Sequence, residues 1–111
     1  MTTEQLKAVE QYLDACETMY FSGSFSEGVI RDDLQARKTN DRISTMTSNP
    51  RQTYYLSEKK QFYYKDFDDA EQYLSSIVNG LKNISTNHAL IPRCEKCKNQ
   101  IGKLRNIVRD F

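Results

Sequence analysis

The sequence predicts an α+β fold that is mostly α-helical, in which three to four amphipathic helices form a small bundle with one short antiparallel β-hairpin. Apolar residues recur at three- and four-residue spacing in several segments, which is the period of a helix with one buried face. Two short aromatic runs separated by four residues have the composition of paired strands. The 111 residues have the length of one small globular domain, residues 1–111.

The first helix is expected over residues 3–21. Thr2 and Gln5 have the spacing of a capping box at its start. Its apolar stripe is wide enough to contact two neighbouring elements, and it contains Leu6, Ala8, Val9, Tyr12, Leu13, Ala15, Cys16, Met19 and Tyr20.

A second, weaker helix is expected over residues 25–43. It is apolar on two thin faces, one with Ile30 and Leu34 and the other with Phe25, Val29, Ala36 and Ile43. A helix of this kind is often long, partly exposed or completed by a partner. Asn49-Pro50 ends any helix that reaches it, because proline disfavours helical geometry in the preceding residue.

The hairpin is expected from residues 53–56 and 61–64, joined by residues 57–60. In this register Tyr54 opposes Tyr63. Because a two-stranded hairpin is marginal alone, one of its faces should pack on the helices. The pattern leaves open whether the outward face carries Tyr54 and Tyr63 or Tyr55, Phe62 and Tyr64.

Two further helices follow, over about residues 67–84 and 92–110. Asp66 is predicted to cap the first of them, and Pro92 suits the first turn of the second. Leu13, Ile77 and Leu104 sit in the middle of the three clearest apolar stripes, so we expect them to be buried together.

The net charge of +1 indicates neither a general nucleic-acid binder nor an acidic mimic of one. The charge is distributed in blocks, because residues 1–33 and 66–90 are acidic while residues 34–65 and 91–111 are basic. Such blocks fit acidic helices that lie beside basic ones. They also fit a molecule with one basic face for a polyanion.

Cys94 and Cys97 form the most distinctive motif, a CxxC pair in the last apolar stripe. We predict that both thiols are buried, reduced and free of metal, because free cysteine is among the most buried residue types. The alternative is a small zinc-stabilised domain with a four-coordinate site made of Cys16, His88, Cys94 and Cys97.

A redox role for the pair has some local support, since a helix start and the neighbouring Arg93 and Lys96 lower a thiol pKa. The strand–helix–strand context of a thioredoxin fold is missing, however. His88 is the sole histidine, and the sequence contains no nucleophile elbow, P-loop or zinc-protease motif. We therefore predict no enzymatic activity and no cofactor.

The aromatic hairpin is the predicted binding surface, because tyrosine gives a large contact area at low entropic cost. The residues predicted to contact a protein partner are Tyr54, Tyr55, Lys59, Lys60 and Tyr63. Exposed tyrosines beside lysines also suit stacking on single-stranded nucleic acid. For that alternative the residues are Arg51, Lys59, Lys60, Lys65, Lys98, Arg105 and Arg109.

The predicted function is a non-enzymatic intracellular protein–protein binding module that acts as an adaptor, regulator or inhibitor of a larger partner. A small inhibitor of phage or plasmid type fits this description. The alternative is a nucleic-acid-binding regulator that uses residues 51–65 and the basic C-terminal helix. With no signal peptide and no apolar run of about 20 residues, we expect a cytoplasmic protein without a membrane partner.

Overall fold

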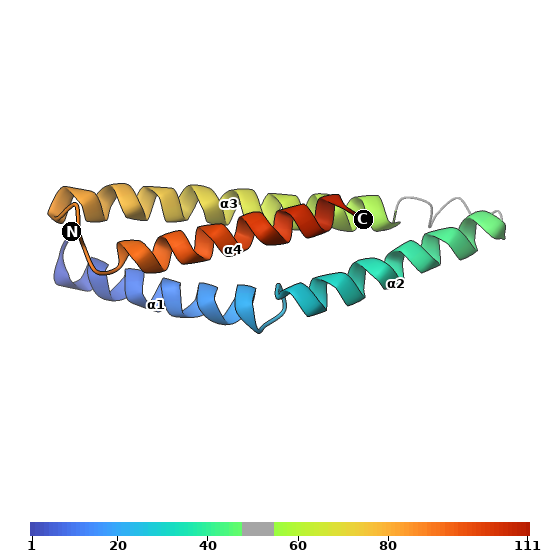
Figure 1. Ribbon diagram of the computed structural model, residues 1–111, viewed down its shortest axis with the longest axis horizontal. Coiled ribbons are helices and arrows are strands. Elements are labelled where there is room, and N and C mark those ends of the chain that lie inside the picture. The colour runs from blue at the N-terminus through green and yellow to red at the C-terminus, as the bar shows by residue number, and fades with distance from the viewer. Residues whose placement is uncertain (48–54) are drawn as a thin grey trace.

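The computed structural model describes residues 1–47 and 55–111, and its regular elements are four helices. They are α1 (Thr3–Phe21), α2 (Glu27–Met46), α3 (Tyr55–Ile84) and α4 (Ile91–Arg109). Helices α1 and α2 follow each other along one side of an elongated molecule, and α3 runs back along the other side (Figure 1). The molecule measures 59 Å along its longest axis and 22 and 20 Å across.

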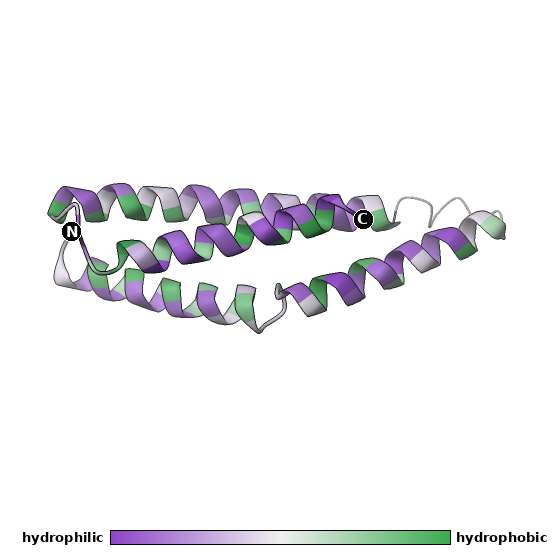
Figure 2. Cartoon of the chain, viewed as in Figure 1, coloured by the Kyte–Doolittle hydropathy of each residue, from purple (hydrophilic) through white to green (hydrophobic). Residues whose placement is uncertain are grey.

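Helix α4 is the central element of this arrangement, because it packs against each of the other three helices. Its most extensive contact is with α3, while the backbones of α1 and α3 hardly approach each other. Figure 2 shows apolar and polar bands alternating along the helices, as expected where each helix buries one face. Buried α4 residues are Cys94, Cys97, Ile101, Leu104, Ile107 and Val108.

The core contains the three residues that were predicted to be buried together. Leu13 of α1, Ile77 of α3 and Leu104 of α4 all belong to one buried apolar cluster, which confirms this prediction. Each of these helices therefore contributes its apolar stripe to a common interior. None of the helices in the described residues combines the length and the apolar composition of a membrane span.

Helix α1 begins and ends as predicted. The Thr2 side chain accepts a hydrogen bond from the Gln5 backbone N–H at 3.1 Å, and the Gln5 side chain accepts from the Thr2 N–H at 2.8 Å. After α1 the chain turns tightly through Gly23. A Cβ atom there would lie 2.9 Å from the Thr18 carbonyl oxygen, so the turn has no room for a side chain.

Helix α2 extends from Glu27 to Met46, beyond the predicted end at residue 43. Ile30 and Leu34 are buried as expected from one of its thin apolar faces, whereas Val29 and Ile43 of the other face are exposed. Of the three outcomes named for such a helix, the structure shows a long and partly exposed one. The predicted break at Asn49-Pro50 lies outside the described residues.

The predicted β-hairpin is wrong. Helix α3 begins at Tyr55 and runs without interruption to Ile84, so residues 55–56, 57–60 and 61–64 are all helical. The described part of the chain contains no β-strand. The remaining hairpin residues, Thr53 and Tyr54, lie outside the described residues. Asp66, predicted as a helix cap, lies inside α3.

Packing explains why this aromatic segment is helical. Tyr63, Phe67, Ala70 and Leu74 are spaced by four, three and four residues, and all four are buried on one face of α3. Strand propensity of aromatic residues reflects how well they pack, and tertiary contacts override it readily. The predicted turn, Ser57 to Lys60, also lacks glycine, proline and asparagine. Its residues are instead ones that are tolerated in a helix.

Candidate functional site

Tyr63, one of the predicted partner-binding residues, is a core residue. Its side chain is 3% exposed, and its hydroxyl donates to Asp33 Oδ2 of α2 at 2.8 Å. Burial and this hydrogen bond both raise the pKa of the Tyr63 phenol. The ring therefore joins α2 to α3 and is not available to a partner.

The other residues predicted for partner binding are spread over one end of α3. Tyr55 is exposed, and the Arg37 guanidinium lies 4.4 Å from the centre of its ring. Lys59 places its ammonium 4.3 Å from the centre of the Phe62 ring, a cation–π contact. Lys60 Nζ donates to the Arg109 carbonyl oxygen at 3.5 Å. Tyr54 lies outside the described residues.

Three basic residues of the nucleic-acid alternative, Lys65, Arg105 and Arg109, form ion pairs with acidic neighbours. Arg105 of α4 contacts Asp68 at 2.6 Å and Glu71 at 2.9 Å, both on α3, and Lys98 lines a surface hollow with the same two acids. Acidic residues of α3 thus lie beside basic residues of α4, as one of the two charge-block interpretations proposed. Further ion pairs join Lys65 to Asp69 and Arg109 to Asp110; Arg51 lies outside the described residues.

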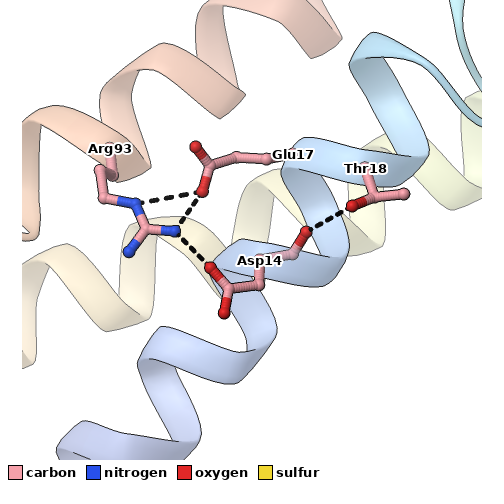
Figure 3. Close-up of polar contacts among 4 residues, drawn as sticks. All are labelled: Asp14, Glu17, Thr18 and Arg93. Carbon is pink, nitrogen blue, oxygen red and sulfur yellow. Dashed lines mark hydrogen bonds and ion pairs between the residues drawn. The ribbon is translucent and has the colours of Figure 1, made fainter.

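A similar ion-pair cluster joins α1 to α4. Arg93 Nη2 donates to Asp14 Oδ1 at 2.8 Å, and Arg93 Nε donates to Glu17 Oε1 at 3.1 Å (Figure 3). The Thr18 hydroxyl donates to the Asp14 carbonyl oxygen one turn earlier. These contacts raise the pKa of the Arg93 guanidinium. They join two acidic side chains of α1 to one guanidinium of α4.

The three cysteines are free thiols in the buried core. Burial raises the pKa of all three, and that of Cys97 reaches about 11. The thiol activation suggested by Arg93 and Lys96 is therefore wrong, because loss of solvent outweighs the nearby positive charge. No group of three or more ligating side chains in residues 1–47 and 55–111 can hold a metal ion. His88 instead accepts a hydrogen bond from the Leu90 N–H at its Nδ1 atom, at 3.1 Å.

We predict that none of the three thiols reacts readily with a disulfide reagent in the native protein. Cys94 and Cys97 are fully buried, and a raised pKa reduces the reactive thiolate. Labelling of the thiols, followed by absorbance, should be slow at pH 8 and should accelerate as the pH rises toward 11. In denaturant all three thiols of each chain should react at once. Rapid labelling of two thiols at pH 7 would contradict this and revive the redox interpretation.

A groove lies between α1 and α3, on a face to which α4 contributes no lining residue. It has a volume of about 500 Å³ and is mainly apolar. We call it the α1–α3 groove. Its lining residues are Tyr12, Ala15, Cys16, Met19 and Tyr20 of α1, together with Asp66, Asp69, Ala70 and Tyr73 of α3.

Side chains from both helices meet across this groove. The rings of Tyr12 and Tyr73 make an edge-to-face contact with centroids 4.6 Å apart, which closes one end. The Tyr20 hydroxyl donates to Asp66 Oδ2 at 2.7 Å. Cys16, Tyr20 and Ala70 are buried and form the floor, whereas Tyr73 at the rim is 56% exposed.

The groove has an acidic character. Asp66 and Asp69 are its charged lining residues, and Asp69 is paired with Lys65 at 2.8 Å. Asp66 is partly buried, and no cationic side chain among the described residues pairs with it. Burial and the hydrogen bond to Asp66 raise the pKa of the Tyr20 phenol, so its hydroxyl stays protonated and donates to Asp66 Oδ2. This neutral hydroxyl does not balance the charge of the carboxylate.

Aromatic ring contacts continue from Tyr20 in the groove to the connection between α1 and α2. Phe25 lies in the α1–α2 connection, with its ring centroid 5.8 Å from that of Tyr20 and 6.3 Å from that of Phe62. Phe62 is 54% exposed. The sequence signal for this surface was the second half of the wide α1 stripe, which includes Tyr12 and Met19. It was interpreted only as packing against a second neighbour.

Comparisons of the chain with protein-family models, with curated proteins and with solved structures found no match.

Proposed function

We propose that the chain is a non-enzymatic protein-binding module and that the α1–α3 groove is its binding site. It would serve as an adaptor, regulator or inhibitor of a larger protein. The observation that carries the proposal is the exposure of the groove's apolar rim. Tyr73 is more than half exposed although the same helix buries seven other residues in the core. The Tyr73 ring stands beside the mainly apolar lining of the groove, and aromatic side chains are enriched at protein interfaces.

The chemistry of the groove favours binding over catalysis. Its single thiol, Cys16, is buried, and burial raises the pKa of that thiol, so it is a poor nucleophile at neutral pH. No histidine lines the groove to act as a base. The remaining side chains are aromatic, aliphatic or carboxylate, which is a composition suited to recognition.

The charge distribution supports a protein partner over a nucleic acid. Arg105 and Lys65 are engaged by acids of α3, which leaves less free positive charge for phosphate groups. The groove itself presents Asp66 and Asp69, and these would repel a phosphate backbone. A nucleic-acid partner would therefore need residues outside this site.

We expect affinity capture by the tagged chain, from a lysate of the organism that encodes it, to depend on Tyr73. Tyr73→Ala removes an exposed ring from the groove rim and should reduce the captured partner by about tenfold, the loss typical of an aromatic interface residue. Phe21→Ala is the matched control. Its ring is also exposed but lines a different hollow, between α1 and α4.

Capture should withstand nuclease treatment and raised salt, since an apolar interface depends little on ionic strength compared with phosphate binding. Circular dichroism of both variants should match the unmodified chain, because both rings are exposed. If Phe21→Ala removes the partner and Tyr73→Ala does not, the groove is not the site. If nuclease removes the partner, the nucleic-acid alternative replaces this proposal.

A further inference from the structure

The open face of the molecule has the form of an incomplete helical bundle. Along the length of α1, both α1 and α3 pack against α4, but the backbones of α1 and α3 hardly approach each other. Side chains alone bridge them on the side away from α4, through Tyr12 with Tyr73 and Tyr20 with Asp66. A helix laid along this side would complete a four-helix arrangement.

The dimensions of the groove suit a helix. On α1 its lining runs from Tyr12 to Tyr20, which corresponds to about 12 Å at the helical rise of about 1.5 Å per residue. A partner helix would therefore contact it over about two turns, with apolar residues at three- and four-residue spacing. Small side chains at Ala15 and Ala70 permit close approach, and Met19 can adapt its shape to a neighbour.

A small molecule is a less suitable occupant, because its sites generally bury roughly 70–90% of the ligand surface. Here Ala15, Asp69 and Tyr73 are all exposed, so the walls are too open to enclose one. Recognition by strand addition is also unsuitable, since the described residues offer no sheet edge.

Asp66 specifies the charge of the occupant. Its carboxylate is partly buried in the groove, holds one hydrogen bond from Tyr20 and has no cationic partner among the described residues. Covering this carboxylate with a purely apolar surface would cost free energy, because a buried charge needs a partner. A guanidinium or ammonium group on the occupant would supply it through a charge-assisted hydrogen bond.

A second copy of this chain fits poorly. In a two-fold dimer the same patch meets itself, so Asp66 and Asp69 of both copies would be brought into one interface. Like charges placed opposite each other in an interface are unfavourable. The charge of the groove thus favours a different protein.

Resting on the function proposed above, we infer that the partner lays an amphipathic helix in the α1–α3 groove and directs an arginine or lysine from its apolar face to Asp66.

The probe for this inference is a display library of 20-residue helix-forming peptides. Each has leucine and alanine on one face, with one position of that face varied among arginine, lysine, glutamine and glutamate. Selection on the full chain should enrich arginine or lysine at the varied position. The selected peptides should bind Asp66→Asn about tenfold more weakly, because the amide keeps an acceptor for Tyr20 but removes the charge.

Asp32→Asn is the matched control, because Asp32 is an exposed acid of α2 that does not line the groove. It should change peptide affinity less than twofold, while Tyr73→Ala should abolish binding. Peptides that need Tyr73 but show no basic preference would overturn this inference and leave the proposed function standing. Peptides that bind independently of Tyr73 would count against the groove itself. A dimer detected by sedimentation and lost in Tyr73→Ala would make the second copy the occupant and overturn the inference.

Discussion

Leu104→Ala should lower the free energy of unfolding by about 2–5 kcal/mol, the usual cost of removing a large aliphatic side chain from a closed core. Leu104 is fully buried on α4, the helix that all three others contact, so the surrounding structure has little freedom to fill the cavity. Urea denaturation followed by circular dichroism measures the change, with the slope against urea concentration expected to stay constant.

Met46→Ala is the control for Leu104→Ala, because Met46 at the end of α2 is 79% exposed. Its substitution should alter stability by less than about 0.5 kcal/mol, as is usual for surface positions. Equal denaturation midpoints for Leu104→Ala and the unmodified chain would contradict the central position of α4.

Tyr63→Ala is expected to be at least as destabilising, with a loss of about 3–5 kcal/mol for the buried ring. The ring lies between α2 and α3, with its centroid 5.7 Å from that of Phe25 and 6.1 Å from that of Phe67. The substitution also removes the donor to Asp33, whose side chain then loses a hydrogen bond in a partly buried position.

Tyr63→Phe separates the two contributions to this effect. It keeps the ring and removes only the hydroxyl, so it should cost about 0.5–1.5 kcal/mol, the net value of one hydrogen bond. Thermal and urea denaturation of both variants provide the comparison. Equal losses for the phenylalanine and alanine variants would mean that the bond to Asp33, and not the packing of the ring, holds α2 against α3.

The helices with strong apolar periodicity were predictable from sequence. Helix α1 has a capping box and a stripe of constant spacing, and both features act within a few residues of chain. Helix α4 has Pro92 in its first turn and an apolar seam that continues to its end. In these segments local propensity and tertiary packing favour the same structure, so a single sequence was sufficient.

The segment before Asp66 was predicted wrongly because two signals competed there. Phe62, Tyr63 and Tyr64 form a run of aromatic residues that is common in strands. The longer signal, which links Leu56 and Tyr63 to Phe67 at helical spacing, became decisive only through packing against α2 and α4. Interpreting residues 55–84 as one window would have favoured a single helix.

The α1–α3 groove was beyond sequence analysis for a different reason. Tyr12 and Tyr73 are 61 residues apart, and nothing local to either residue indicates that their rings meet. Helices α1 and α3 each pack against α4 while their own backbones hardly approach each other, and the groove lies in the space between them. The exposed half of the α1 stripe could be recognised from sequence, but its partner across the groove could not.

The central position of α4 also governs when the protein can fold during synthesis. A ribosome makes α1, α2 and α3 before the helix that packs against all of them. Until α4 emerges, the faces of these helices that pack on α4 have no partner and stay accessible to chaperones and to other nascent chains. Arg93 and Glu17 are separated by 76 residues of chain, so the contact between α1 and α4 is non-local and forms late. Forming it requires closing a long loop, which costs chain entropy. Completion of the core shared with α4 therefore has to wait until residues 91–109 have been made.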